Sequence, residues 1–488
     1  MKVIYLSSEV VPFAKTGGLA DIAGAIPKSL QKIGVEMIVF MPFYRVVKEN
    51  AYPVKKTDIR FEVRIGGKIK YGFVYKGFLP DSQVPIYFLD NEQYFSRQGL
   101  YNYLGTMNDY EDNSERFIFF SQGVLEVVEK LNVFPHILHC NDWQTGLVPV
   151  YVKTKYAGKA CFKNTKTILT IHNLAYQGNF GHLDMNLTGL DWSLFTWKQL
   201  EFYGKLSFLK GGIVFSDLIT TVSKTYAQEI QTPEFGEGLD GVLKERANDI
   251  YGIINGIDYT IWNPETDKFI IANYGTKNLS GKRLCKKALQ GKYNLPERDV
   301  PVIGMITRLA DQKGLDLVVD RFQDFMKVDI QFILLGTGEQ RYHEFFQNYA
   351  KTHPTKVAVK LSFDERSAHE IEAGADMFLM PSRYEPCGLN QLYSLRYGTV
   401  PIVRNTGGLA DTIVDVRSKP LSNGKANGFS FQAYNSDLLL ATIIRAMNLF
   451  KDKTQWTNLM KNGMAQDWSW ERSAREYATL YKNIVKEK

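Results

Sequence analysis

The chain has 488 residues, which is too many for one ordinary hydrophobic core, so at least two domains are expected. Its hydrophobic fraction of 44% and charged fraction of 23% are typical of a soluble globular protein. The formal net charge of +7 is spread along the chain, which argues against nucleic-acid binding and allows a modest attraction to anionic metabolites. No apolar stretch is long enough to span a bilayer, so no membrane partner is expected.

Short apolar, β-rich runs recur along the chain and are often followed by helical patterns. This alternation predicts an α/β fold class, with parallel sheets covered by helices on both faces. Residues 61–75 alternate differently and predict an antiparallel hairpin that turns at Gly66 and Gly67, with 73–78 and 85–89 as candidate extensions. The predicted strands are 3–6, 37–41, 137–139, 167–171, 218–222, 302–306, 331–335, 377–380 and 400–403.

The first domain is predicted to end at about Ile257. Asn255-Gly256 and Asn263-Pro264 are turn signals with no long helical pattern between them, and a new series of strands and helices follows. The last residues, 469–488, predict an amphipathic helix. The predicted domains are 1–256 and 257–465.

The cysteines have neither a CxxC pairing nor the spacing of zinc ligands, so reduced thiols in a cytoplasmic protein are expected. The N-terminal apolar run is too short for a signal peptide and predicts a buried first strand instead. The four cysteines are Cys140, Cys161, Cys285 and Cys387.

The six residues TGGLAD occur twice, at 16–21 and at 406–411. Each copy follows a predicted strand and begins a predicted helix, and the copies fall in different predicted domains. Paired glycines let a ligand approach the backbone, and the N-terminus of the next helix attracts anions such as phosphate. A tight strand-to-helix turn explains either copy alone, but two copies in matching contexts favour two loops that face one cleft.

Three cations lie at predicted strand-to-helix turns. Arg308 and Lys313 follow the strand 302–306, where a parallel sheet binds its ligands. Together they suit a diphosphate whose negative charge grows as a bond to it breaks. Two cations at a helix start are otherwise disfavoured by the helix dipole, which suggests an anion between them. Lys15, immediately before the first TGGLAD, is either a point charge against phosphate or an ordinary surface lysine.

Glu385 precedes Pro386, a residue suited to the first turn of a helix, so a helix is expected to begin near Pro386. The Glu385 carboxylate then either accepts hydrogen bonds from sugar hydroxyls or serves the helix dipole. In the first case the amides of Cys387, Gly388 and Leu389 face an anion. The Cys387 thiol is more consistent with packing than with a nucleophile, because no histidine is near it in sequence.

Two histidines, His139 and His172, lie at predicted strand ends in the first half. Asp142 and Trp143 follow His139, and these groups at the mouth of a sheet make a sugar pocket, although a strand-end histidine is often only structural. No DxD, HExxH or GxxxxGK[ST] pattern occurs, so no metal site is expected. GTGEQR at 336–341 lacks the third glycine of GxGxxG and supports dinucleotide binding only weakly.

Several segments follow one another in a recognisable order: KTGGLADIAGAIPKSL, HCNDWQTGLVP, HNLAYQG, TPEFGEGLDGVL, RLADQKGLDL and PSRYEPCGLNQLYSLRYGTVPIVRNTGGLADT. They resemble the bacterial glycogen synthase and plant starch synthase family over nearly the whole chain. The resemblance implies the GT-B fold, with two Rossmann-like doubly wound domains facing across a deep interdomain cleft. The helix from about 466 to 488 is then expected to pack back on the first domain.

The resemblance also implies the reaction. It is the retaining transfer of glucose from ADP-glucose to the non-reducing-end 4-OH of an α-1,4-glucan, such as glycogen, starch or a maltooligosaccharide, with release of ADP. No metal or organic cofactor is expected. The implied location is the cytoplasm, or the plastid stroma for a mature plant chain, and the oligomeric state stays open.

Carried over residue by residue, the resemblance implies three groups of site residues. Cys140 and Asn141 receive no role, because the pair after His139 varies among relatives. The catalytic group is Glu385, His172, Arg308, Lys313, Lys15 and Asp142. The nucleotide-sugar group is Lys15, Gly17, Gly18, Asn255, Arg308, Lys313, Gly336, Gly338, Tyr384, Glu385, Cys387, Gly388, Leu389, Thr406 and Gly407. The acceptor group is Tyr94, His139, Asp142 and Trp143.

Two alternatives remain at this point. Another GT-B enzyme, such as a phosphorylase or a sucrose-type synthase, would share the fold, and a phosphorylase would need a lysine for pyridoxal phosphate. A non-catalytic glucan-binding protein would also share it, but pure glucan binding does not need the cations that hold a diphosphate.

Overall fold

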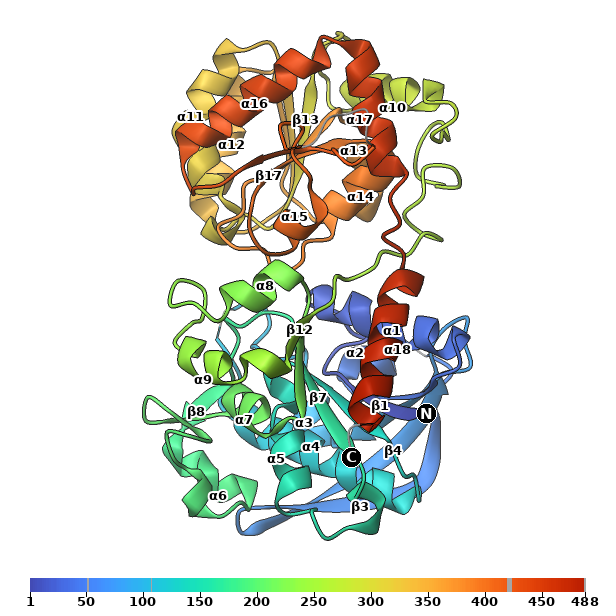
Figure 1. Ribbon diagram of the computed structural model, residues 1–488, viewed down its shortest axis with the longest axis vertical. Coiled ribbons are helices and arrows are strands. Elements are labelled where there is room, and N and C mark those ends of the chain that lie inside the picture. The colour runs from blue at the N-terminus through green and yellow to red at the C-terminus, as the bar shows by residue number, and fades with distance from the viewer. Residues whose placement is uncertain (51, 107, 419–423, 487–488) are drawn as a thin grey trace. The chain divides into compact units, whose positions relative to one another are not determined.

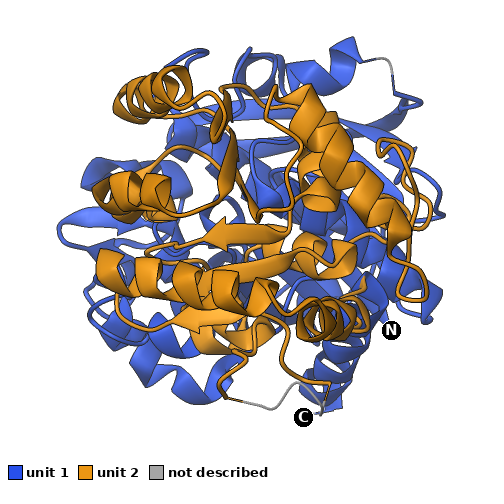
Figure 2. Ribbon diagram, turned by 90° about the horizontal axis from the view of Figure 1, so that it is seen from above, with its two compact units in different colours: residues 1–222, 227–256, 470–488 blue, residues 223–226, 257–469 orange. Residues whose placement is uncertain are grey.

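The computed structural model describes residues 1–50, 52–106, 108–418 and 424–486. The chain divides into two compact units, which Figure 2 colours separately. Unit 1 contains residues 1–222, 227–256 and 470–488, and unit 2 contains residues 223–226 and 257–469.

Unit 1 is built on a nine-stranded sheet in the order β12-β11-β7-β6-β1-β2-β5-β4-β3. The strands from β12 to β5 pair in parallel, whereas β5, β4 and β3 pair antiparallel. Every strand predicted in the first half overlaps an observed one, because these apolar runs form buried strands. The strands are β1 (Lys2–Leu6), β2 (Glu36–Pro42), β3 (Lys55–Ile65), β4 (Lys68–Phe78), β5 (Pro85–Asp90), β6 (Ile137–Asn141), β7 (Lys166–Ile171), β11 (Leu218–Thr221) and β12 (Ile250–Gly252).

The predicted hairpin is formed by β3 and β4, and it turns at Gly66 and Gly67 as expected. Gly66 has a φ of 56°, a left-handed conformation that glycine adopts without a steric penalty. Alternate β3 residues Phe61, Val63 and Ile65 are buried while those between them are exposed, which explains the alternating sequence pattern. A second, three-stranded antiparallel sheet was not predicted and has the order β8 (Asn179–Gly181), β10 (Lys205–Ser207), β9 (Glu201–Phe202).

The helices α1 (Gly18–Lys32) and α18 (Trp470–Lys486) lie side by side in unit 1 (Figure 1). Lys32 of α1 pairs with Glu471 of α18 at 3.4 Å. Residues 466–469 belong to unit 2, so the segment that returns to unit 1 begins later than the resemblance implied. The other helices that begin before residue 250 are α2 (Arg45–Glu49), α3 (Glu92–Phe95), α4 (Asn113–Lys130), α5 (Leu147–Lys153), α6 (Met185–Thr188), α7 (Phe208–Phe215), α8 (Lys224–Glu229) and α9 (Asp240–Glu245).

Unit 2 is built on a six-stranded sheet in the order β15-β14-β13-β16-β17-β18, and all its strands are parallel. The four strands predicted in this half are confirmed. The two edge strands, β15 and β18, were missed because each is a short run without a clear periodicity. The strands are β13 (Val302–Ile306), β14 (Gln331–Leu335), β15 (Val357–Lys360), β16 (Met377–Met380), β17 (Val400–Arg404) and β18 (Phe429–Phe431).

Helices pack an aromatic core against this sheet. On α11, Val318, Phe322 and Phe325 are buried at the three- and four-residue spacing of one helix face. The Phe322 ring contacts those of Phe332 on β14 and Phe346 on α12, with centroids 5.3 and 5.4 Å apart. The helices of unit 2 are α10 (Ser280–Lys292), α11 (Leu315–Lys327), α12 (Gln340–Thr352), α13 (Glu365–Gly374), α14 (Asn390–Tyr397), α15 (Gly407–Thr412), α16 (Ser436–Phe450) and α17 (Lys453–Met464).

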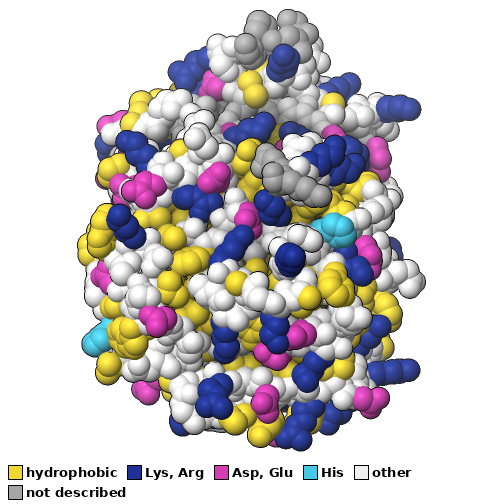
Figure 3. Space-filling view, turned by 60° about the horizontal axis from the view of Figure 1, so that its bottom comes forward, with side chains coloured by type: hydrophobic (Ala, Val, Ile, Leu, Met, Phe, Trp, Pro, Cys, Tyr) yellow, Lys and Arg dark blue, Asp and Glu magenta, His cyan; other side chains and the backbone are white. Residues whose placement is uncertain are grey.

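Within the described ranges, no helix combines the length and the apolar composition that crossing a membrane requires. The same residues contain no cluster of three or more His, Cys, Asp or Glu side chains that could hold a metal ion. The face drawn in Figure 3 intersperses Lys and Arg with Asp and Glu side chains. All four cysteines are buried.

Candidate active site

The predicted diphosphate site lies at the carboxyl edge of the unit 2 sheet. Arg308, Gly336, Glu385 and Thr406 follow β13, β14, β16 and β17 respectively, each within five residues of the strand end. Because parallel strands end at the same edge of a sheet, these four loops share that edge, which is where open α/β sheets bind ligands.

Glu385 and Lys313 form an ion pair at this edge. The Lys313 Nζ lies 2.7 and 3.0 Å from the two carboxylate oxygens of Glu385. The Ser382 hydroxyl also donates to this carboxylate, at 2.9 Å. Glu385 is buried, with 6% of its surface exposed, and Lys313 is half-buried. The structure therefore brings together a buried carboxylate and a cation that the sequence separates by 72 residues.

Arg308 stands beside this pair with an exposed side chain. Its Nη2 donates to the Gln312 side-chain oxygen at 2.8 Å, and the Gln312 amide donates to the Tyr384 carbonyl at 3.5 Å. The contacts run from Arg308 to Tyr384, the residue before Glu385. The exposed guanidinium of Arg308, beside the ion pair of Lys313 with Glu385, is a cation that an anion can reach at this edge.

The second TGGLAD packs tightly against the loop that carries Glu385. A Cβ on Gly407 would lie 2.0 Å from the Glu385 carbonyl oxygen, and a Cβ on Gly408 would lie 2.1 Å from that of Cys387. The Gly408 N–H donates to the carbonyls of Glu385 and Pro386, both at 3.1 Å. Thr406 is fully buried. These glycines are needed because the two loops touch, so they fix the shape of the Glu385 loop.

The helix after Glu385 begins later than predicted. Helix α14 starts at Asn390, whereas the sequence placed its start near Pro386. Gly388 has a φ of 70°, which interrupts a helical path before Leu389. The correction places the amides of Cys387, Gly388 and Leu389 in an irregular loop ahead of the helix.

Two further glycines, Gly336 and Gly338, let the loop after β14 approach the loop after β13. A Cβ on Gly336 would lie 1.8 Å from the Thr307 carbonyl oxygen, and one on Gly338 would lie 2.2 Å from that of Leu309. The Gly338 N–H donates to the His343 Nε2 at 3.0 Å. Both glycines lie where the sequence placed a nucleotide contact, and close packing of backbone on backbone requires them.

The first TGGLAD is open, unlike the second. A Cβ on Gly17 or Gly18 would meet nothing within 4 Å. The Lys15 side chain is 48% exposed and its Nζ pairs with Asp21 at 2.7 Å. The sequence suggested that backbone N–H groups of this turn face a phosphate. In the structure the N–H groups of Thr16 and Gly17 instead donate to the carboxylate of Glu9.

His172 and Asp142 lie together at the ends of β7 and β6. The Asp142 Oδ1 accepts the His172 backbone N–H at 2.7 Å. The His172 Nε2 lies 2.8 Å from the Asn141 side-chain oxygen, and the Asn141 amide donates to the Leu6 carbonyl, so Nε2 carries the proton. His172 Nδ1 is then an acceptor, buried and without a partner among the described residues. Burial lowers the pKa of His172 to about 3, so the ring is neutral near pH 7.

Asn141 is a contact of the candidate site residue His172 that sequence reasoning missed. It received no role because its position varies among relatives. Its side chain nevertheless fixes the ring orientation of His172 and accepts the Tyr5 hydroxyl at 3.0 Å. The signal in the sequence was its place at the end of β6, next to Asp142.

Three residues of the predicted acceptor group are buried in unit 1, and their role in acceptor binding stays a prediction. Tyr94 has no exposed surface, and its hydroxyl contacts Glu115. His139 is 1% exposed, and its ring nitrogens contact the hydroxyls of Tyr481 and Thr170 at 2.5 and 2.6 Å. Trp143 is 8% exposed, and its ring contacts Phe117, Phe180 and Phe208. In this structure all three side chains are in contact with other protein groups. Asn255 is also buried, in the segment after β12.

The titration of Asp142 gives a testable consequence. Burial raises the pKa of this carboxyl from 3.8 to about 7. The folded protein then holds this proton more tightly than the unfolded chain, so the stability that the proton contributes is lost as pH rises towards 7. We expect the denaturation midpoint of the wild type to fall between pH 5 and pH 8 relative to that of Asp142→Asn. Urea unfolding of both proteins across this range measures the difference, and parallel curves would contradict the assignment.

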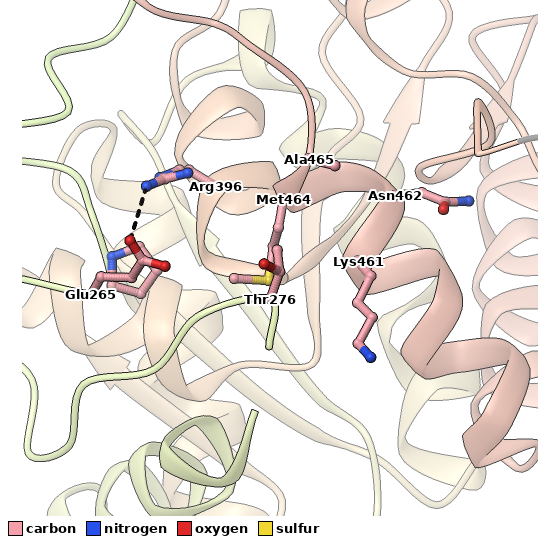
Figure 4. A pocket seen from close by; sticks show the side chains of 8 residues that line it. Glu265, Thr276, Arg396, Lys461, Asn462, Met464 and Ala465 are labelled. Carbon is pink, nitrogen blue, oxygen red and sulfur yellow. Dashed lines mark ion pairs between the residues drawn. The ribbon is translucent and has the colours of Figure 1, made fainter. Parts of the chain in front are cut away.

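A cavity of about 400 Å³ in unit 2 is lined by other residues. Figure 4 shows Arg396 turned towards Glu265 on one side and Lys461 pointing away from both. The Arg396 guanidinium lies 3.9 Å from Glu265 and donates to Asn263 at 2.7 Å. None of the predicted site residues lines this cavity. Its lining is Pro264, Glu265, Thr276, Arg396, Lys461, Asn462, Met464 and Ala465.

Matches to two protein families agree with the fold. Residues 2–245 match the family described as the starch synthase catalytic domain, and residues 287–462 match glycosyl transferases group 1. A sucrose-phosphate synthase from Thermosynechococcus elongatus aligns over 100% of both chains with a TM-score of 0.59, and its 15% identity makes it a likeness of fold alone. The chain is a glycosyltransferase of the GT-B class, with two Rossmann-like α/β domains.

Individual proteins similar to this chain identify its family within the GT-B glycosyltransferases. The glycogen synthase of Thermosipho africanus is 48% identical over 99% of each chain, and that of Geotalea daltonii is 47% identical over 100% of each. The catalytic domain of starch synthase IV from Arabidopsis thaliana, bound to ADP and acarbose, matches with a TM-score of 0.88 and 33% identity over 99% of each chain. The chain belongs to the glycogen synthase and starch synthase family.

Proposed function

We propose that this protein transfers glucose from ADP-glucose to the non-reducing-end 4-OH of an α-1,4-glucan, with retention at the anomeric carbon and release of ADP. The observation that carries the proposal is the grouping of Arg308, Lys313 and buried Glu385 at the carboxyl edge of the unit 2 sheet. The related starch synthase IV with bound ADP and acarbose supports a nucleotide and a glucan as partners.

The two cations are proposed to hold the donor diphosphate. The guanidinium of Arg308 presents a planar set of donors, and the ammonium of Lys313 is a compact charge, so the two complement each other against phosphate oxygens. Glu385 keeps Lys313 in place before the donor binds and then accepts hydrogen bonds from hydroxyls of the transferred glucose. The loop Cys387–Leu389 and Thr406 are proposed to contact the glucose and the diphosphate of the bound donor.

The reaction is proposed to proceed by stabilisation of the leaving group. The bond from the anomeric carbon to the diphosphate oxygen breaks, and the diphosphate keeps the electron pair. The acceptor 4-OH then bonds to the anomeric carbon on the same face, and its proton passes to an oxygen of the leaving phosphate. Arg308, Lys313 and Lys15 supply the positive charge that this diphosphate needs, so the proposal includes no resident metal or organic cofactor.

His172 and Asp142 are proposed to bind the reacting sugar. The unpartnered Nδ1 of the neutral His172 ring is a buried acceptor suited to one sugar hydroxyl. The proposed location is the cytoplasm, or the plastid stroma for a mature plant chain; the cysteines have no CxxC spacing of a disulfide framework.

Phe363 is the proposed contact of the adenine base, and the sequence reasoning missed it. Its side chain is 86% exposed in the loop after β15, at the same carboxyl edge as Arg308. An exposed aromatic ring beside a nucleotide site provides a stacking surface. We expect Phe363→Ala to raise the KM for ADP-glucose about 10-fold with a smaller change in kcat, and Phe363→Tyr to retain the wild-type value.

Steady-state kinetics with varied donor measure this effect. Phe78→Ala is the matched control, because Phe78 is 50% exposed on β4 of unit 1. An unchanged KM in Phe363→Ala would refute the contact between Phe363 and the adenine base. It would not bear on the proposed diphosphate site.

The whole proposal is tested by nucleotide release from two donors. The protein is incubated with ADP-glucose or UDP-glucose, each with and without glycogen. We expect ADP release that depends on glycogen and exceeds UDP release. Faster release of UDP would show that UDP-glucose is the preferred donor. Release that does not depend on glycogen, or no release from either donor, would refute the proposed glucosyl transfer.

A further inference from the structure

The open glycine loop that carries Lys15 is fastened by one buried carboxylate. Glu9 lies three residues after β1 and is 4% exposed. Its carboxylate accepts hydrogen bonds from the Thr16 N–H, from the Thr16 hydroxyl at 2.6 Å and from the Gly17 N–H at 3.2 Å. The Tyr101 hydroxyl adds a fourth at 2.8 Å.

These four bonds use the whole accepting capacity of the Glu9 carboxylate. Oε1 accepts the hydroxyls of Thr16 and Tyr101, and Oε2 accepts the N–H groups of Thr16 and Gly17. A carboxylate has about four lone-pair sites, so none is left for a substrate. Glu9 therefore acts through the residues it holds.

Side chains of the described residues do not pack against the two glycines of this loop. Positions Gly17 and Gly18 have open space where a Cβ would lie, and glycine itself restricts the backbone least. Glu9 has a firm base, because the Ser7 hydroxyl donates to the Glu9 carbonyl at 2.6 Å. The Tyr101 hydroxyl also contacts the Ser8 hydroxyl at 2.7 Å. The Glu9 carboxylate thus connects the glycine loop at Thr16 and Gly17 to the segment that follows the buried strand β1.

We propose that Glu9 is a positioning residue for glucosyl transfer, which holds the 15–17 loop so that Lys15 meets the donor. This inference rests on the role proposed for Lys15. Without the carboxylate the loop samples other conformations, and a displacement of about 1 Å at a catalytic group can cost ~10²-fold in rate.

The first test is a set of variants at Glu9. We expect Glu9→Ala to lower kcat about 10- to 100-fold, with a smaller change in the KM for glycogen. Glu9→Gln keeps one accepting oxygen and is expected to recover part of the loss. Hydrogen exchange at the amides of Thr16 and Gly17 is expected to accelerate in Glu9→Ala. Glu62→Ala is the matched control, since Glu62 is an exposed carboxylate on β3 of the same unit.

A double-mutant cycle with Lys15 separates positioning from a general structural effect. If Glu9 acts by placing Lys15, Lys15→Ala and the double variant Glu9→Ala/Lys15→Ala have the same kcat within about twofold. Multiplied losses in the double variant would overturn the proposal. Normal turnover in Lys15→Ala would instead refute the role of Lys15, and an impaired Lys15→Ala with a normal Glu9→Ala would refute only that of Glu9.

Two milder variants keep the test decisive if Glu9→Ala does not fold. Thr16→Val and Tyr101→Phe each remove one hydrogen bond to the carboxylate and leave the charge in place. Each is expected to lower kcat about 2- to 5-fold and to lose this effect in the Lys15→Ala background. Unchanged kcat in both variants, with melting temperatures equal to that of the wild type, would overturn the proposal.

Discussion

Arg308→Ala is expected to lower kcat by about 10²–10³-fold while the protein stays folded. The guanidinium is proposed to stabilise the diphosphate as it leaves, so its loss acts mostly on the transition state. The fold is expected to survive because the side chain is exposed and its recorded partner is the neighbouring Gln312. Turnover with ADP-glucose and glycogen measures the effect, and ADP affinity is expected to fall as well.

Arg298→Ala is the matched control for this variant. Arg298 is an exposed arginine of the same unit, paired with Asp329 at 2.9 Å. Its removal is expected to leave kcat unchanged. Near-normal turnover in a folded Arg308→Ala protein would contradict the role assigned to the guanidinium.

Glu385→Gln is expected to lower kcat by about 10²-fold while the affinity for ADP stays within about threefold of the wild type. Glutamine keeps the size of the side chain but loses the charge that holds Lys313 and accepts from sugar hydroxyls. ADP carries no glucose, so it does not report on a sugar contact. Lys313 stays available to the diphosphate in this variant. The side-chain oxygen of the glutamine can still accept the hydrogen bond from the Ser382 hydroxyl.

Kinetics and ADP titration calorimetry on the same preparation test this split. Glu372→Gln is the control, because Glu372 is a fully buried carboxylate of unit 2 that accepts the Ser394 hydroxyl at 2.7 Å. Burial raises the pKa of Glu372 to about 8, so the amide changes little at neutral pH. A loss of ADP affinity equal to the loss of kcat in Glu385→Gln would place Glu385 in the diphosphate site instead.

The sequence predicted the sheets well because the parallel strands are buried apolar runs between turn signals. It also placed Arg308 and Glu385 at the carboxyl edge of one sheet, since the residues that follow parallel strands must share one edge. The ion pair of Lys313 with Glu385 could not be predicted, because a sequence pattern does not show which residues of two separate loops come into contact. Likewise, Pro386 suggested a helix start that the left-handed Gly388 moves to Asn390.

Depth from the surface was the main quantity that sequence patterns did not supply. A strand-end histidine such as His139 and an aromatic such as Trp143 read alike in a pocket and in a core, and both are in the core. The identical TGGLAD copies also differ in a way that no local sequence can show. Gly17 stands in open space, whereas a Cβ on Gly407 would meet the Glu385 carbonyl. One copy is a loop held by Glu9, and the other is a packing surface.

The central claim is that the carboxyl edge of the unit 2 sheet binds the diphosphate of the donor. A crystal structure of the full chain with ADP tests this claim most directly. The account predicts that phosphate oxygens lie within hydrogen-bonding distance of the Arg308 guanidinium and the Lys313 ammonium. A diphosphate bound away from both, for instance in the cavity beside Arg396, would contradict it.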